Sequence, residues 1–244
     1  MKAPPEGASS PGRRDASRMR TWAELRSAAL EEVREHGAVA LSLRRVARRM
    51  GMSPAGLYRY VASREDLLTI LITDAFDSLA DHLEAAASAG EDPHDDAVAR
   101  LRAVGLAYRS WGVKHPQEFG LVFGDPLPGY VAPEDGPTVR AMGRVGAALG
   151  EPLRTAWEQG RLRPAIPALP AELTGRLAPM AKITGDPGRH ELAVALLITW
   201  GRLHGQVSLE VFGQHAWLFP DGCEALFRMD LEAMLRDLGL VRPG

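Results

Sequence analysis

The sequence predicts an all-α protein built from two parts. Apolar residues recur at helical spacing from Thr21 almost to the C-terminus of the 244-residue chain, and no stretch shows a strand pattern. A break at residues 89–93, which combines Gly, Asp and Pro, separates an N-terminal head from a larger C-terminal body. We expect a disordered basic arm over residues 1–19, a small helical domain over 20–85 and a helical domain over 94–244.

The arm is dominated by Pro, Gly, Ser and Arg, a composition that cannot bury enough apolar surface to fold. Its Arg13, Arg14 and Arg18 could follow a phosphate backbone. A tail without a role fits the same composition equally well.

The first and last helices of the head are predicted by apolar stripes. Gly37 is placed to end the first helix, and the pattern Ser-Arg-Glu-Asp from Ser63 resembles a capping box that opens the last one. The first stripe is Trp22, Leu25, Ala29 and Val33, and the last is Leu68, Ile72, Ala75, Leu79 and Leu83.

Two short helices lie between them. Ser42 begins the first of these, which Gly51 ends. Ser53 caps the second, with Pro54 in the first helical position, where a missing N–H costs nothing. Two helices joined by a tight turn form a helix-turn-helix, in which the second helix can enter the major groove of DNA.

The residue types of that second helix, in the segment SPAGLYRY, suit such a role. Ala55 and Gly56 are small and let the backbone approach bases closely. Tyr58 and Tyr60 carry hydroxyls on rigid rings that can reach phosphates. Arg59 can reach a phosphate or a guanine edge.

The net charge of −2 hides an asymmetry along the chain. Residues 1–64 hold 13 Lys and Arg against 6 Asp and Glu, a net charge of +7, and the remainder carries −9. A basic head on an acidic body indicates that only the head meets a polyanion, although a solvated basic face has the same composition.

Composition also excludes several classes of protein. The single cysteine, Cys223, rules out an internal disulfide framework and fits a reducing cytoplasm. The longest apolar run, Leu192–Trp200, is too short to cross a bilayer, and the N-terminus lacks a secretory pattern. We therefore expect a cytoplasmic protein.

The segment LSLRRVARRMGMSPAGLYRYVASREDLL, with the amphipathic helix before it, resembles the N-terminal domain of TetR-family transcriptional regulators. The resemblance covers Thr21 to Leu83. It implies a bacterial homodimer that binds a pseudo-palindromic operator, usually as a repressor, and that a small molecule releases from DNA.

The resemblance also implies which residues contact DNA, and we add Arg45 from the basic supporting helix. We expect Arg44, and then Arg59, to read bases. The full set is Ser42, Arg44, Arg45, Ser53, Pro54, Ala55, Gly56, Tyr58, Arg59, Tyr60 and Arg64.

The body is predicted to be helical apart from a long loop rich in proline and glycine at residues 124–137. The predicted helices are 95–114, 116–123, 137–161, 170–184, 188–213 and 221–238.

The last two helices are expected to pair with their symmetry mates in a four-helix dimer interface, as in the family. Helix 188–213 has two apolar faces, and its glycines allow close approach of a neighbour. A plain monomer core is the alternative. The expected interface residues are Leu197, Gly201, Gly205, Ser208, Phe227, Leu231, Met234 and Leu238.

The segments WGRLHG at 200–205 and KHPQEFGLVFG at 114–124 resemble the Trp-His-Gly subclass of TetR C-terminal domains. We expect a pocket for an apolar or aromatic effector, although aromatic residues at helical spacing also form plain core. Its expected lining is Trp111, His115, Phe119, Phe123, Trp157 and Trp200.

An enzyme is the least favoured function. The sequence contains no paired carboxylates, no nucleophile pattern and no metal-ligand spacing, so we expect no catalytic residues, metal or cofactor. A helical protein-interaction module without operator binding is the remaining alternative.

Overall fold

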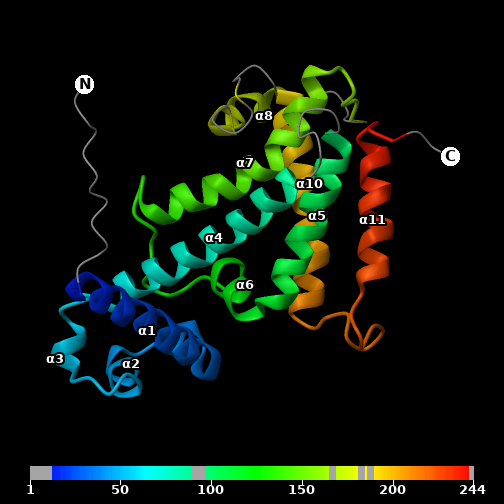
Figure 1. Ribbon diagram of the computed structural model, residues 1–244. Coiled ribbons are helices and arrows are strands. Elements are labelled where there is room, and N and C mark those ends of the chain that lie inside the picture. Colours follow the sequence, from blue (N-terminus) through cyan, green and yellow to red (C-terminus); the bar gives the residue numbers. More distant parts are fainter. Residues whose placement is uncertain (1–12, 90–96, 165–168, 181–184, 186–189, 242–244) are drawn as a thin grey trace, which may run out of the picture. The chain divides into compact units, whose positions relative to one another are not determined.

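The computed structural model describes residues 13–89, 97–164, 169–180, 185 and 190–241, and the regular structure in those ranges is entirely helical (Figure 1). The chain divides into two compact units. The head unit comprises the chain up to Leu71 together with Pro126–Val131, and the body unit comprises Ile72–Asp125 together with the chain from Ala132. No helix in the described ranges is long and apolar enough to cross a membrane.

The head unit contains three complete helices, one short 3₁₀ turn and the beginning of a long helix. These are α1 (Arg13–His36), η1 (Ala38–Ala40), α2 (Leu43–Arg49), α3 (Pro54–Leu57) and α4 (Arg64–Ser88), which continues into the body unit.

Helix α1 begins at Arg13, eight residues before the predicted start at Thr21. Residues 13–19 contain no proline or glycine, and their Arg, Ala and Met are good helix formers. These residues are therefore helical, and a disordered arm is wrong for this stretch. Residues 1–12, and the side chains of Arg13 and Arg14, lie outside the described part, whereas Arg18 is exposed.

The predicted helix ends in the head are confirmed. Gly37 has a φ of 80°, and its N–H donates to the carbonyl of Val33 at 2.8 Å. Gly51 has a φ of 66° in the turn between α2 and α3. The hydroxyl of Ser53 accepts from the N–H of Gly56 at 3.1 Å, and the hydroxyl of Ser63 accepts from the N–H of Asp66 at 3.0 Å. Each device satisfies a group that a helix end leaves open.

The body unit contains the rest of α4 and the helices that follow. They are α5 (Ala97–Lys114), α6 (Pro116–Phe123), α7 (Pro137–Glu158), α8 (Ala171–Arg176), η2 (Ala178–Met180), α10 (His190–Val211) and α11 (Glu224–Asp237).

Five of the six predicted body helices are present with bounds within three residues of those expected. The exception is 170–184, where α8 stops at Arg176 and η2 follows. Pro179 offers no backbone N–H and disfavours helical geometry at Ala178, so an uninterrupted helix is wrong there. Residues 181–184 lie outside the described part.

Helix α5 forms the centre of the body unit and packs against α6, α7, α10 and α11. Gly112 permits a close approach, because a Cβ there would lie 2.8 Å from Val207 of α10 and 3.1 Å from the ring of Phe119 of α6. Tyr108 and Trp111 of α5 are fully buried. The sequence that forms α5 therefore carries the largest side chains of this core.

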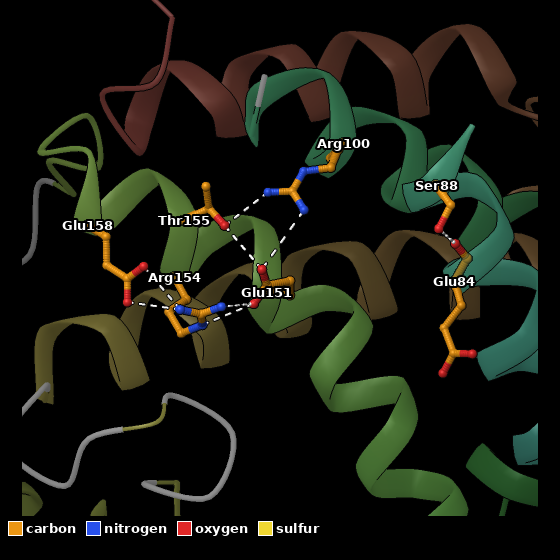
Figure 2. A network of polar contacts seen from close by, with 7 residues as sticks. All are labelled: Glu84, Ser88, Arg100, Glu151, Arg154, Thr155 and Glu158. Carbon is orange, nitrogen blue, oxygen red and sulfur yellow. Dashed lines mark hydrogen bonds and ion pairs between the residues drawn. The ribbon is translucent and has the colours of Figure 1, made fainter. Parts of the chain in front are cut away.

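Polar contacts tie the C-terminal end of α7 to α5, as Figure 2 shows. Arg100 of α5 donates to the hydroxyl of Thr155 at 2.9 Å and lies 4.0 Å from the carboxylate of Glu151. Arg154 pairs with Glu151 and Glu158 on its own helix, and these bonds raise its pKa. This network stabilises the packing of α5 against α7 within the body unit.

Candidate nucleic-acid interface

The helix-turn-helix of the head unit rests on a small apolar core. Leu43, Val46 and Ala47 of α2 are buried, as are Leu57 at the end of α3 and Val61 beyond it. Together they fix α3 on α2, so that the polar side chains of both helices stand on a packed support.

Helix α3 is a single turn, and residues 58–60 continue as turns. The N–H of Tyr60 donates to the carbonyl of Leu57 at 2.8 Å. Tyr58 is 53% exposed, and Arg59 is exposed beside it. The hydroxyl and ring of Tyr58 are therefore accessible from solvent.

The tip of α3 carries only small groups. Ser53, Pro54 and Ala55 are exposed, and Gly56 is half-buried. A Cβ at Gly56 would lie 3.3 Å from the Ser53 hydroxyl, so the glycine also leaves room for the cap. The side chain of Ser42, at the start of α2, makes no capping bond and is half-buried.

The arginines of the head separate into two groups. Arg44, Arg48 and Arg59 are exposed and make no hydrogen bond or ion pair within the part of the chain that the structure describes. Arg49, by contrast, bonds to Glu35 at 2.5 Å and lowers the pKa of that carboxyl. Among the arginines of residues 42–64, only the first group can bind a phosphate or a base without breaking an existing hydrogen bond or ion pair.

Arg45 belongs to the second group. Its guanidinium binds the carboxylate of Glu32 on α1 and the backbone carbonyl of Ala40, and Glu32 is only 1% exposed. Glu32 lies seven positions after Leu25, and therefore on the same apolar face of α1. An acidic residue on an apolar face is the feature of the sequence that indicates a buried carboxylate in need of a positive partner. We therefore assign Arg45 to the folding of the head rather than to its free surface.

Arg64 and Tyr60 also have partners inside the head unit. Arg64 donates to the carbonyls of Ala38 and Val39, each at 3.0 Å, and so holds η1 against the start of α4. The ring of Tyr60 packs edge-on against Trp22 of α1, with ring centroids 5.5 Å apart. Sequence spacing alone does not predict that Arg64 donates to backbone carbonyls of η1.

Glu32, Glu35 and His36 lie close enough together to hold a metal ion. Both carboxylates already bind arginines, Glu32 with Arg45 and Glu35 with Arg49. Those pairs supply the positive charge that the cluster requires.

Aromatic rings cluster in the body unit where the sequence predicts an effector pocket, and Phe76 and Phe212 pack at the edge of this cluster. The predicted residues Phe119, Phe123 and Trp200 are joined by Tyr108 and His204, with ring centroids 4.9–6.4 Å apart. The rings pack against one another and form a shared core of α5, α6 and α10.

His204 is the polar centre of this ring cluster. Its Nδ1 lies 2.8 Å from the hydroxyl of Tyr108 and its Nε2 lies 3.3 Å from the hydroxyl of Ser208. Its ring stacks on Trp200 and Phe119. Burial lowers the pKa of His204 and raises that of Tyr108. The spacing of four residues from Trp200 could have placed His204 in this group.

The other predicted pocket residues lie elsewhere. The buried Trp111 donates to the hydroxyl of Ser78 at 3.1 Å and packs against His115, and Trp157 lies half-buried on α7. Trp111 and His115 line a groove of about 540 Å³. Its remaining lining comes from α4: Asp74, Asp77, Ser78, Asp81, His82 and Ala85.

The predicted dimer residues divide between the surface and the core. Leu197 and Gly201 of α10 are exposed, and a Cβ at Gly201 or Gly205 would meet nothing within 4 Å. Ser208 bonds inward to His204. The remaining four are buried within the protomer and unavailable to a partner, which corrects their assignment: Phe227, Leu231, Met234 and Leu238. Their face of α11 packs against α5 and α10.

Two family models match the chain. Residues 25–69 match the model described as bacterial regulatory proteins, tetR family. Residues 101–234 match the model described as tetracyclin repressor-like, C-terminal domain. The first match contains α2, α3 and the second half of α1. The second contains α6, α7, α8, η2 and α10, with most of α5 and α11.

The HTH-type transcriptional regulator Rv1816 of Mycobacterium tuberculosis is 34% identical over 206 residues, which cover 84% of this chain and 86% of that protein. The regulatory protein SCO4313, known from a crystal structure, has 32% sequence identity to this chain. The match covers 91% of this chain and 98% of that one, with a TM-score of 0.72. The TetR-family regulator PfmR of Thermus thermophilus shares the fold at 20% sequence identity. The match covers 89% of this chain and 99% of PfmR, with a TM-score of 0.57. The chain belongs to the TetR family of transcriptional regulators, with an N-terminal helix-turn-helix DNA-binding domain.

Proposed function

We propose that the protein is a repressor that binds a pseudo-palindromic operator as a homodimer and is released from DNA by a small molecule. The observation that carries the proposal is the division of the head arginines. Arg44, Arg48, Arg59 and Tyr58 are all exposed, whereas Arg45 and Arg49, the other arginines of α2, are paired with carboxylates of α1. Unpaired guanidinium groups and a phenol hydroxyl on a helix-turn-helix can donate hydrogen bonds to the phosphate oxygens of DNA.

Within this interface the proposed roles differ. The tip of α3 offers no hydrogen-bonding side chain beyond Ser53, so base readout must come from a long side chain nearby. We assign it first to Arg44 and second to Arg59, either of which can bind a guanine edge through two parallel bonds. Tyr58 is assigned to a phosphate.

The homodimer is proposed to form through the exposed face of α10. Leu197 and Ile198 stand out from that face next to Gly201, and Phe212 is exposed farther along the chain. An apolar surface that also lacks side chains at Gly201 and Gly205 allows a second helix to approach closely.

The effector is proposed to be an aromatic compound. The groove beside Trp111 and His115 offers rings on one wall and three α4 carboxylates on the other, of which those of Asp77 and Asp81 also bind Arg144. A ligand that combines an aromatic ring with a positive charge would use both walls.

Selection of bound fragments from random duplex DNA tests the proposal. Tyr58→Phe should weaken binding to all sequences alike, because a phosphate contact carries no base information. Arg44→Ala should relax preference at particular base pairs, at a cost of about 1–3 kcal/mol. A wild-type protein that enriches no sequence would favour the interaction module without operator binding.

A further inference from the structure

One arginine of α7 binds three carboxylates of α4 within the body unit. Nη1 of Arg144 lies 2.8 Å from Asp77, and its Nη2 lies 2.5 Å from Asp81 and 2.7 Å from Glu84. Nε of Arg144 also donates to Glu84 at 3.1 Å. We call these four residues the α4–α7 ion-pair cluster.

The spacing of the carboxylates brings all three within reach of this arginine. Asp77, Asp81 and Glu84 follow one another at four and three residues, so they lie on one face of α4 and repel each other. Arg144 neutralises part of this negative charge. Its hydrogen bonds to Glu84, Asp81 and Asp77 raise the pKa of the guanidinium above its ordinary value. All four side chains are partly exposed, so each pair alone is weak and is screened by salt. The contact is therefore one that modest forces can open.

Helix α4 is also the helix that the two units share. Its first residues, Arg64–Leu71, belong to the head unit, and Ile72–Ser88 belong to the body unit. Within the body unit, Ile72–Ser88 contact α5 through the Trp111–Ser78 hydrogen bond, α6 through the Phe76–Phe123 ring pair, and α7. Besides the ion-pair cluster, the hydroxyls of Thr73 and Thr138 join α4 to α7 at 3.0 Å.

We propose that Arg144 is a positioning residue that holds α4 on α7 and thereby fixes the spacing of the two DNA-binding heads. The inference rests on the proposed dimer, because only two heads on one operator have a spacing to fix. If α4 moved freely, the two heads would adopt the spacing of the operator only part of the time. The affinity for a site with two halves would then be lower.

Amide hydrogen exchange of Arg144→Gln tests the contact without DNA. Exchange in residues 77–88 should be about three- to tenfold faster than in the wild type, as expected for loss of a few weak ion pairs. Arg140→Gln is the matched control, since Arg140 lies one turn away on α7 and donates to the backbone carbonyl of Asp135. Equal exchange in Arg144→Gln and Arg140→Gln would overturn the proposal.

A mutant cycle tests whether the carboxylates act through Arg144. The triple variant Asp77→Asn, Asp81→Asn, Glu84→Gln should lose the same protection, and adding Arg144→Gln to it should change little. Arg144→Lys should be intermediate, because it keeps the charge but cannot reach three carboxylates at once. Fully additive effects would contradict a shared contact.

DNA binding supplies the functional result. Arg144→Gln should bind the full selected operator about three- to tenfold more weakly, while its affinity for a single half-site stays at the wild-type value. Equal loss on both DNAs would show that Arg144 acts inside the head, which contradicts the proposal. A wild-type protein that binds neither DNA would refute the proposed function instead, and the exchange experiment would still decide whether Arg144 holds α4.

Discussion

Two neighbouring arginines of α2 show how differently adjacent residues are used. The side chain of Arg44 is exposed and makes no hydrogen bond or ion pair within the described ranges, whereas that of Arg45 neutralises a carboxylate that is 1% exposed. Helical geometry separates the two by 100° around the axis, which turns one outward and the other onto α1. Function and stability are thus assigned to different members of one arginine pair.

Substitution of each arginine should separate these roles. Arg45→Ala leaves Glu32 buried without its partner and should lower the free energy of unfolding by about 2–3 kcal/mol, allowing for partial exposure of Arg45. Arg44→Ala should change it by less than about 0.5 kcal/mol while reducing sequence preference on DNA. Urea unfolding of both variants checks the first effect. Equal losses of stability would mean that Glu32 does not depend on Arg45.

His204 should make the stability of the protein depend on pH. Its folded-state pKa is lowered by burial, so the unfolded chain binds the proton more tightly. This contribution is fully present above the unfolded pKa of about 6.5 and is lost progressively as pH falls below it. Unfolding measured from pH 7.5 downward should show a smaller decline for His204→Gln than for the wild type, with His115→Gln as the half-exposed control. Identical pH profiles for wild type and His204→Gln would exclude this histidine as the source.

The sequence predicted which residues stand on the surface of α3 but not which charges are already paired. Arg45 and Arg64 look the same as Arg44 in sequence, because their partners, Glu32 and the carbonyls of η1, come from segments 13 to 26 residues away. The ring cluster was found only in part, since Tyr108 and His204 join it through the packing of α5 on α10. Pairing across helices is set by tertiary structure, which periodicity does not encode.

At the level of elements, local chemistry predicted the helices well. Proline at the first position marks the starts of α3, α6 and α7, and glycines with positive φ mark several ends. Two predicted helix bounds were wrong, the start of the first helix and the end of the helix predicted at 170–184. Arg13–Met19 joined α1 because no breaker follows Gly12, and Pro179 interrupted the expected helix after α8.

The interface residues of α11 illustrate a limit of amphipathic patterns. Phe227, Leu231 and Met234 repeat at helical spacing, which predicts a buried face but not whether the protomer or a partner covers it. In the structure α5 covers this face, and Leu231 lies 3.0 Å from the Cβ position of Gly105. The apolar face that stays open belongs to α10.

Gly201→Arg should therefore separate dimer formation from folding. The new side chain meets open space within the protomer and gains about 0.5–1 kcal/mol of helix propensity, so helical content should be retained. A charged side chain in the proposed interface should weaken dimerisation on the order of 100-fold. Sedimentation of Gly201→Arg, beside the exposed control Met142→Arg on α7, checks this. A Gly201→Arg variant that stays dimeric would place the interface elsewhere.

For the whole molecule, charge and architecture agree. The net charge of +7 lies in residues 1–64, which include the helix-turn-helix, and the remaining chain is acidic and repels DNA. Helix α4 begins in the head unit and continues into the body unit.

The most direct test of the account is the affinity of the wild-type protein for a selected duplex as salt is raised, with random-sequence DNA as competitor. Phosphate contacts from the basic heads predict that log K falls linearly as log[salt] rises, with a slope of about −0.9 for each phosphate that an arginine neutralises. The preference for the selected duplex should survive the competitor. A flat salt dependence, or equal affinity for selected and random DNA, would contradict the claim that this surface reads an operator.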